Sequence, residues 1–161
     1  MRRFLSLAIA STFTLLFSSQ AQAQTFTFTA DLSGGNEVPG VATGSGGTAT
    51  VTLNAATNEL TWVIDVYNLP SGVTASHIHA GAPGVAGPVV INFPVAATSS
   101  NDFRISGSAN LSALVARPAQ GINSADDFKQ MLLNEDAYVN VHSQANPGGE
   151  IRGPLRLVTQ F

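Results

Sequence analysis

The chain contains no cysteine among its 161 residues. This absence excludes disulfides, thiolate metal ligands, catalytic thiols and iron–sulfur clusters. Charge is also scarce, because Asp, Glu, Lys and Arg make up 11% of the chain, with 7 basic residues against 10 acidic ones. The basic residues form no cluster, so we expect no nucleic-acid partner. Histidine is rare as well, with three residues in the whole chain.

The first residues have the pattern of a signal peptide. A basic start at Arg2 and Arg3 precedes an apolar run, 4–17, that is too short to span a membrane comfortably. Ala21-Gln22-Ala23 then fits the small-x-small pattern that precedes a signal-peptidase cut. We therefore expect residues 1–23 to be a signal peptide and the mature protein to be periplasmic or secreted, without a membrane span. The alternative is an uncleaved anchor.

Residues 24–161 have the length of a single domain with a hydrophobic core. They are rich in Gly, Thr, Ser, Ala and Val, which is typical of a compact all-β domain with many tight turns. Apolar runs bounded by turn residues predict about eight strands, at residues 25–29, 46–53, 59–69, 76–80, 89–93, 102–106, 138–142 and 150–158. This pattern favours an all-β fold, either a Greek-key β-sandwich or a flattened barrel.

One or two short helices are expected within this β-domain. Ser124 is a suitable N-cap, and Asp126 and Asp127 follow it in the first turn, where the helix dipole favours negative charge. Apolar residues at helical spacing, Phe128, Met131 and Leu132, predict the face that packs on the core. Residues 110–116 are expected to form a second, shorter helix or a turn.

All three histidines lie in two of the predicted strands. Successive side chains of a strand point to opposite faces, so His77 and His79 share one face while Ile78 takes the other. His142 likewise lies opposite Val141 on its own strand. If the aliphatic residues face the core, the three imidazoles gather on the outer face of the sheet. Three nitrogen ligands are what a copper or zinc ion needs, so His77, His79 and His142 are the candidate metal ligands.

Residues near the histidines have two interpretations. Glu150 and Arg152 share a face by the same alternation, and we expect an ordinary cross-strand ion pair, with support of the metal ligands as the alternative. Asn36 and Glu37 precede a proline and are expected to shape a turn. The loop 81–88 contains several glycines but lacks the Lys and Ser/Thr of a phosphate-binding loop, so we expect it to border the histidine face.

Five segments resemble the CHRD domain, a family named for its occurrence in the developmental protein chordin and also found in secreted bacterial proteins. They are Leu32–Pro39, His77–Gly81, Gly87–Val90, Tyr138–Ser143 and Asn146–Gly153. They occur in the family's order and extend over nearly all of the expected mature chain, 24–161. The resemblance implies a secreted β-domain and does not by itself imply an activity.

A second likeness concerns the histidines alone. A His-x-His strand followed by a Val-His strand is similar to the copper-ligand arrangement of the copper–zinc superoxide dismutases, which also use a Greek-key barrel. This likeness implies His77, His79 and His142 as copper ligands. The chain lacks a fourth histidine to bridge to zinc, a histidine-rich zinc loop and a disulfide pair. It therefore supports a site for one metal ion and not for two.

Three hypotheses follow for the function. The first is a secreted binding module that holds copper or zinc through the three histidines. The second is a metal-free structural or protein-interaction domain of the cell envelope or extracellular space, in which the histidines form a hydrogen-bonded network. The third is an enzyme, for which redox chemistry at a three-histidine copper is the one route that the sequence offers. No serine stands in a G-x-S-x-G turn, and no nucleophile–base arrangement is visible.

Overall fold

The computed structural model describes residues 24–160 except 97 and 99. The expected signal peptide, 1–23, lies outside the described residues. Within the described part of the chain, no helix is both long and apolar enough to cross a membrane.

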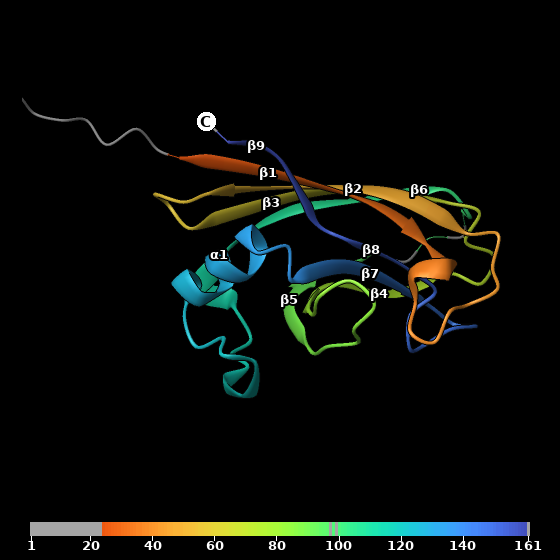
Figure 1. The fold of residues 1–161 in the computed structure, drawn as a ribbon. Coiled ribbons are helices and arrows are strands. Elements are labelled where there is room, and N and C mark those ends of the chain that lie inside the picture. The colour runs from red at the N-terminus through yellow and green to blue at the C-terminus, as the bar shows by residue number, and fades with distance from the viewer. Residues whose placement is uncertain (1–23, 97, 99, 161) are drawn as a thin grey trace, which may run out of the picture.

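Nine strands and one α-helix make up the domain (Figure 1). The strands are β1 (Thr25–Ser33), β2 (Gly46–Asn54), β3 (Glu59–Tyr67), β4 (Val73–Ala80), β5 (Val89–Phe93), β6 (Phe103–Asn110), β7 (Ala137–Ser143), β8 (Ile151–Pro154) and β9 (Arg156–Gln160). The helix is α1 (Ala125–Leu133), and three 3-10 turns are η1 (Gly34–Asn36), η2 (Leu111–Ala113) and η3 (Pro118–Gln120).

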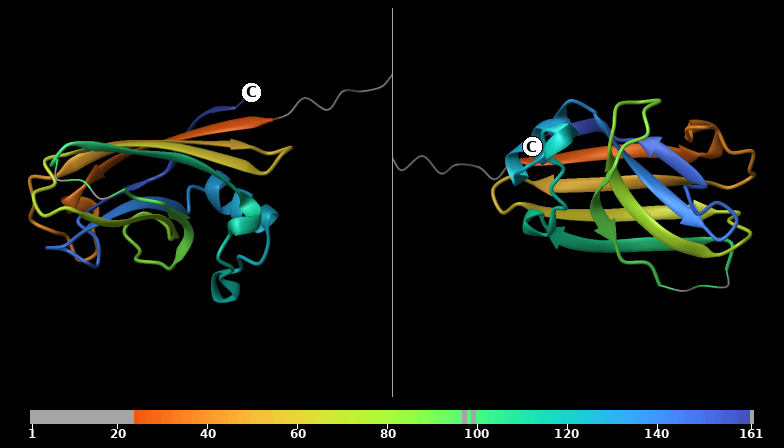
Figure 2. Two further views of the ribbon diagram at one scale, coloured as in Figure 1. Left: turned by 180° about the vertical axis from the view of Figure 1, so that it is seen from behind. Right: turned by 90° about the horizontal axis from the view of Figure 1, so that it is seen from below.

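The strands form one antiparallel sheet that folds over itself into two layers (Figures 1 and 2). The order is β5-β4-β7-β8-β1-β2-β3-β6, and β9 pairs with β1. The sheet turns from one layer to the other where β8 meets the end of β1, at the single register pair Ser33 and Arg152. β7 returns by a long connection to lie beside β4, as a Greek key requires. The predicted all-β fold, a Greek-key sandwich or flattened barrel, is confirmed.

The core lies between the two layers and follows the period-2 pattern of the strands. On β3, Leu60, Trp62 and Ile64 are buried while the residues between them are exposed. Trp62 crosses the interior to stack on Phe93 of β5, with ring centroids 4.4 Å apart. Each fully buried aliphatic or aromatic side chain stabilises the fold by about 1.5–3 kcal/mol relative to an exposed one. The alternation therefore determines which face of each strand turns inward.

The predicted helix is present and closes one end of the sandwich (Figure 1). Ser124 Oγ accepts a hydrogen bond from the backbone N–H of Asp127, which confirms it as the N-cap. Phe128 and Leu132 are fully buried against the core. The segment 110–116, expected as a second short helix or turn, contains the single 3-10 turn η2.

Several strand predictions needed correction. β1 extends beyond residue 29 to Ser33, and β4 begins at Val73 instead of residue 76. The segment 150–158 is not one strand but two, because Pro154 has no N–H to continue the ladder and the chain moves from the layer of β7 to that of β1. β6 extends well beyond residue 106, to Asn110. The sequence there, with Gly107, has little strand character of its own, but β3 pairs with it along its length.

Candidate metal centre

The three histidines lie where strand parity predicts, on the face of the sheet opposite the core. β4 and β7 are neighbours, and their register pairs His77 with Asn140 and His79 with Tyr138. Ile78 and Val141, on the opposite face, are fully buried in the core. The ring centroid of His77 lies 5.4 Å from that of His79 and 4.9 Å from that of His142.

This outer face is not open to solvent, because loops cover it. His79 and His142 are each only 8% exposed, whereas His77 is half-buried. The loop 81–88 contacts His79 through the carbonyl of Gly87, and the turn after β7 contacts His142 through the carbonyl of Pro147. The expected site on the outer sheet face is therefore a partly enclosed one. Strand alternation places side chains on a face, but it does not report what folds over that face.

Backbone carbonyls determine which nitrogen of two rings carries the proton. His79 Nδ1 lies 2.9 Å from Gly87 O, and His142 Nδ1 lies 3.0 Å from Pro147 O. A carbonyl oxygen only accepts, so both Nδ1 atoms donate and both Nε2 atoms keep a lone pair. His142 Nε2 is 3.1 Å from His77 Nδ1. His79 Nε2 is buried without a hydrogen-bond partner among the described residues.

The site keeps all three imidazoles neutral. Burial lowers the pKa of His77 to about 4, helped by the nearby His142 and His79. Burial also lowers the pKa of His79 and of His142, although the bond to a backbone carbonyl opposes it in each case. Neutral imidazole is the form that binds a metal ion, because the ligand needs a free lone pair.

The donor atoms approach the spacing that one metal ion requires. One ligand atom from each histidine can be chosen so that all three lie within 4.8 Å of one another. Nitrogens bound to one ion lie about 3–4 Å apart, because each metal–nitrogen bond is about 2 Å. The 3.1 Å pair of His77 Nδ1 and His142 Nε2 already meets this condition. No carboxylate belongs to this cluster in the described part of the chain.

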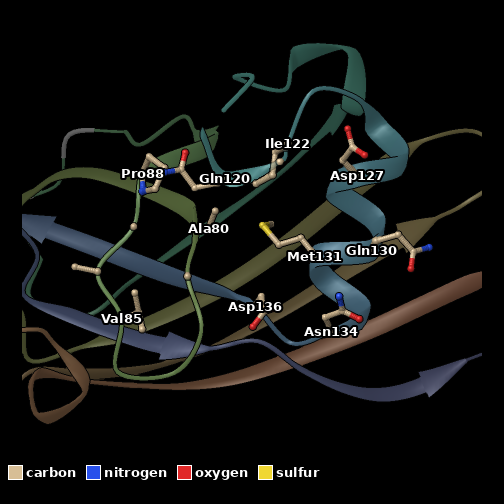
Figure 3. A pocket seen from close by; sticks show the side chains of 14 residues that line it. Ala80, Val85, Pro88, Gln120, Ile122, Asp127, Gln130, Met131, Asn134 and Asp136 are labelled. Atoms are coloured by element: carbon tan, nitrogen blue, oxygen red, sulfur yellow. The ribbon is translucent and has the colours of Figure 1, made fainter. Parts of the chain in front are cut away.

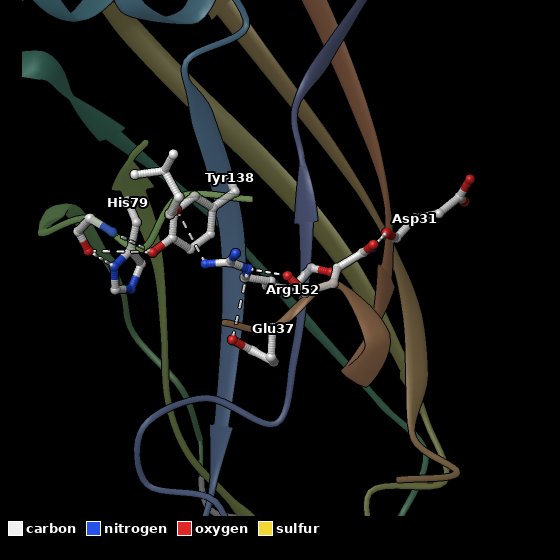
Figure 4. Close-up of polar contacts among 8 residues, drawn as sticks. Asp31, Glu37, His79, Tyr138 and Arg152 are labelled. Atoms are coloured by element: carbon white, nitrogen blue, oxygen red, sulfur yellow. Dashed lines mark hydrogen bonds and ion pairs between the residues drawn. The ribbon is translucent and has the colours of Figure 1, made fainter. Parts of the chain in front are cut away.

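Tyr138 supports His79 from the neighbouring strand (Figure 4). The two rings stack with centroids 4.9 Å apart and planes inclined by 15°. The Tyr138 hydroxyl accepts a hydrogen bond of 3.1 Å from the N–H of Gly87, the residue whose carbonyl holds His79. On the other side of Tyr138, the Arg152 guanidinium lies 4.6 Å from the ring centroid. Tyr138 therefore fixes both the ring and the loop that orients it.

Arg152 does not pair with Glu150, so the predicted ion pair between them is wrong. Arg152 is buried, donates from Nε to the carbonyl of Asn36, and faces Glu37 with Nε and Oε2 3.9 Å apart (Figure 4). Glu37 comes from the connection after β1, which has no periodicity, and sequence reasoning assigned it only to a turn. Burial raises the pKa of Glu37 to about 7. The positive charge of Arg152 acts in the opposite direction but is the smaller effect. The pairing depends on chain segments that meet only in the folded domain.

Glu150 instead binds hydroxyl groups. Its Oε1 accepts hydrogen bonds from Thr43 Oγ1 at 2.7 Å and Ser45 Oγ at 2.8 Å, and its Oε2 accepts one from Ser143 Oγ. Burial acts to raise the pKa of Glu150, but these hydrogen bonds outweigh it and hold the pKa below the usual value. Glu150 thereby ties the connection after η1 to the turn that carries Pro147.

A cavity of about 510 Å³ lies on the other side of the loop 81–88, between that loop and α1 (Figure 3). The Met131 side chain reaches into it from the helix, and Ile122 forms part of its wall. Its lining includes Asp127 and Asp136 but no Lys or Arg. Gly87 belongs to this lining as well as to the histidine cluster, so the loop separates the two sites.

Comparison with known proteins supports the family resemblance. The profile of the CHRD domain matches residues 28–155, a span that includes all three histidines and the residues around them. No curated protein and no solved structure gives a significant match, and nothing in these comparisons supports the likeness to the superoxide dismutases. Because the match extends over most of the sequence, the chain belongs to the CHRD domain family.

Proposed function

We propose that this CHRD domain is an exported module that binds a copper or zinc ion through His77, His79 and His142. The observation that carries the proposal is the Nε2 atom of His79, which is buried with a free lone pair and has no hydrogen-bond partner among the residues that the structure describes. A buried polar atom without a partner destabilises a fold by about 1–3 kcal/mol. A metal ion bound at this atom removes that cost.

The surroundings of the cluster support the same proposal. Histidines that bind metals generally donate their other ring N–H to a carbonyl or carboxylate, which fixes the tautomer and the ring orientation. His79 and His142 both do so here, through Gly87 and Pro147. Imidazole ligands suit copper and zinc, and three of them leave a coordination position open. Export depends on residues 1–23, whose pattern is that of a signal peptide.

The alternative is a metal-free structural or protein-interaction domain. The bond between His77 Nδ1 and His142 Nε2 favours it, because it pairs two of the histidines without any ion. In that case His79→Ala lowers the melting temperature in the presence of a chelator, through lost packing on Tyr138. An unchanged melting curve for this variant in chelator counts against the alternative.

Metal titration of the chelator-treated protein tests the proposal. We expect Cu(II) or Zn(II) to raise the melting temperature, since a ligand at 100 times its Kd stabilises the folded state by about 2.7 kcal/mol. His79→Ala and His142→Ala abolish this gain, and Gln144→Ala, at an exposed position just after β7, retains it. A melting temperature that ignores both metals at neutral pH overturns the proposal.

Export is tested separately by the mass of the protein recovered outside the cytoplasm. The expected species begins at Gln24. Recovery of the full-length chain in the membrane fraction contradicts cleavage and favours the uncleaved anchor.

A further inference from the structure

The histidine cluster offers a metal ion no negative charge. Histidine binds a metal ion as neutral imidazole, and no carboxylate lies within the cluster among the described residues. A divalent ion there keeps its full charge in a partly enclosed site, where solvent screens it poorly. We propose that the metal at this site takes a small inorganic anion as its fourth ligand, an inference that rests on the proposed metal binding.

The nearest fixed charges favour an anion further. Arg152 lies over the ring of Tyr138, which stacks on His79. Arg117 donates from Nε to the carbonyl of Val89, the register partner of His79 on β5. The Tyr138 ring separates Arg152 from His79 (Figure 4). The positive charge of Arg152 therefore acts on the cluster, but the Arg152 side chain does not fill the space next to the histidines. The two guanidinium groups therefore contribute a positive potential at the cluster before an ion binds.

The neighbouring carboxylates do not cancel this potential. Glu37 faces Arg152, and its pKa of about 7 keeps much of it uncharged at neutral pH. Both oxygens of Glu150 face hydroxyl groups, Oε1 those of Thr43 and Ser45 and Oε2 that of Ser143, and no histidine. Neither side chain belongs to the group of converging ligand atoms.

Access to the cluster limits the size of the anion. His79 and His142 are buried beneath loops, and His77 is the one member of the three that is half-buried. We therefore expect an anion to enter beside His77, and a small one such as halide, azide or cyanide is favoured. The larger cavity on the other side of the loop 81–88 does not suit an anion, because Asp127 and Asp136 line it without any Lys or Arg.

The inference is tested by adding sodium azide to the copper(II)-loaded full chain after free copper has been removed by gel filtration. Azide bound to Cu(II) gives a charge-transfer absorption band in the near ultraviolet. We expect a band that saturates with azide concentration, together with a change in the copper electron paramagnetic resonance spectrum. Sodium perchlorate at the same ionic strength leaves both spectra unchanged. Copper must remain with the protein throughout, as checked by a second gel filtration.

Charge variants then locate the source of the attraction. Arg152→Gln raises the azide concentration at half-saturation by about threefold or more, because it removes one positive charge near the site, whereas Arg152→Lys largely preserves it. Arg104→Gln is the matched control, since Arg104 is exposed on β6 in the other layer and pairs with Asp65. If Arg152→Gln fails to fold, Arg117→Gln replaces it.

The outcomes separate this inference from the proposed function. Copper binding with a saturable azide band supports both. Copper binding without any azide band contradicts the proposed anion ligand but remains consistent with the proposed metal site. Binding of neither copper nor zinc by the wild-type chain overturns both. An equal effect of Arg104→Gln and Arg152→Gln contradicts the local origin of the attraction.

Discussion

The ring of Tyr138 lies flat against the ring of His79, and the hydroxyl of the same Tyr138 holds the N–H of the residue whose carbonyl orients that histidine. One side chain thus controls a ring and its hydrogen-bond acceptor together. Tyr138→Phe keeps the stacking but leaves the Gly87 N–H without its partner. We expect a loss of about 1 kcal/mol in the free energy of unfolding and a severalfold weaker metal affinity, measured by thermal melting and calorimetry. Tyr67→Phe, at an exposed tyrosine on β3, changes neither quantity.

Gly87 is predicted to tolerate no side chain. A Cβ at this position would lie 1.5 Å from the carbonyl oxygen of Ala80, so Gly87→Ala forces the loop 81–88 away from β4. The Gly87 carbonyl then no longer holds His79, and we expect at least a tenfold loss of zinc affinity by calorimetry with the fold retained by circular dichroism. Gly148→Ala is the control, because nothing lies within 4 Å of a Cβ built there. Equal zinc affinity for Gly87→Ala and the wild type contradicts the orienting role of the loop.

The metal-free protein should lose stability in mildly acidic solution through His77. Burial lowers its pKa from 6.5 to about 4 in the folded state, so the unfolded chain binds the proton more readily. Its contribution is present above pH 6.5 and is lost as the pH falls from there toward 4, by at most about 3 kcal/mol. Urea unfolding in chelator at several pH values measures this, and His77→Gln removes that part of the slope. Identical pH dependence in the two proteins rules the assignment out.

The contribution of Glu37 to stability changes with pH in the opposite direction to that of His77. Its pKa rises from 4.5 to about 7 on folding, so its contribution is present below pH 4.5 and is lost as the pH rises through 7. We expect Glu37→Gln to be more stable than the wild type at pH 8, by at most about 3 kcal/mol, and to lose this advantage near pH 5. Glu59→Gln, at an exposed position, serves as control. A variant less stable than the wild type at pH 8 would show that Glu37 works mainly as a charged partner of Arg152.

Glu150 is expected to be the most sensitive carboxylate in the described part of the chain. Glu150→Gln replaces an oxygen that accepts hydrogen bonds with an amide that donates, opposite Ser143 or the pair Thr43 and Ser45. The loss should be about 2–4 kcal/mol, because a buried, fully bonded charged group is replaced by a mismatched one. Chemical denaturation measures it. Ser143→Ala removes one of the three hydrogen bonds to Glu150 and should lower the free energy of unfolding by less than Glu150→Gln does. A change of under half a kilocalorie for Glu150→Gln would contradict the role of this carboxylate as a link between two loops.

The face on which each histidine lies could be predicted from the sequence because it depends on strand parity alone. Because Ile78 and Val141 turn to the core, strand alternation places all three histidines on the opposite face of the sheet. That β4 and β7 are neighbours, in a register that brings the rings together, did not follow from periodicity, since the segments are far apart in the chain. The Ser124 cap was predictable for a similar reason, because a cap is made by residues within one turn.

The sequence by itself determined the all-β class, the inward face of most strands and the three histidines as the polar members of two of them, because these depend on interactions between residues close in the chain. Tertiary structure alone decided that loops enclose the outer face, that Arg152 faces Glu37 instead of Glu150, and that one nitrogen of His79 has no partner within the described part of the chain. These features arise where distant segments meet. Their geometry is set by long-range pairing and by the carbonyls of aperiodic loops, which carry no repeating pattern to read.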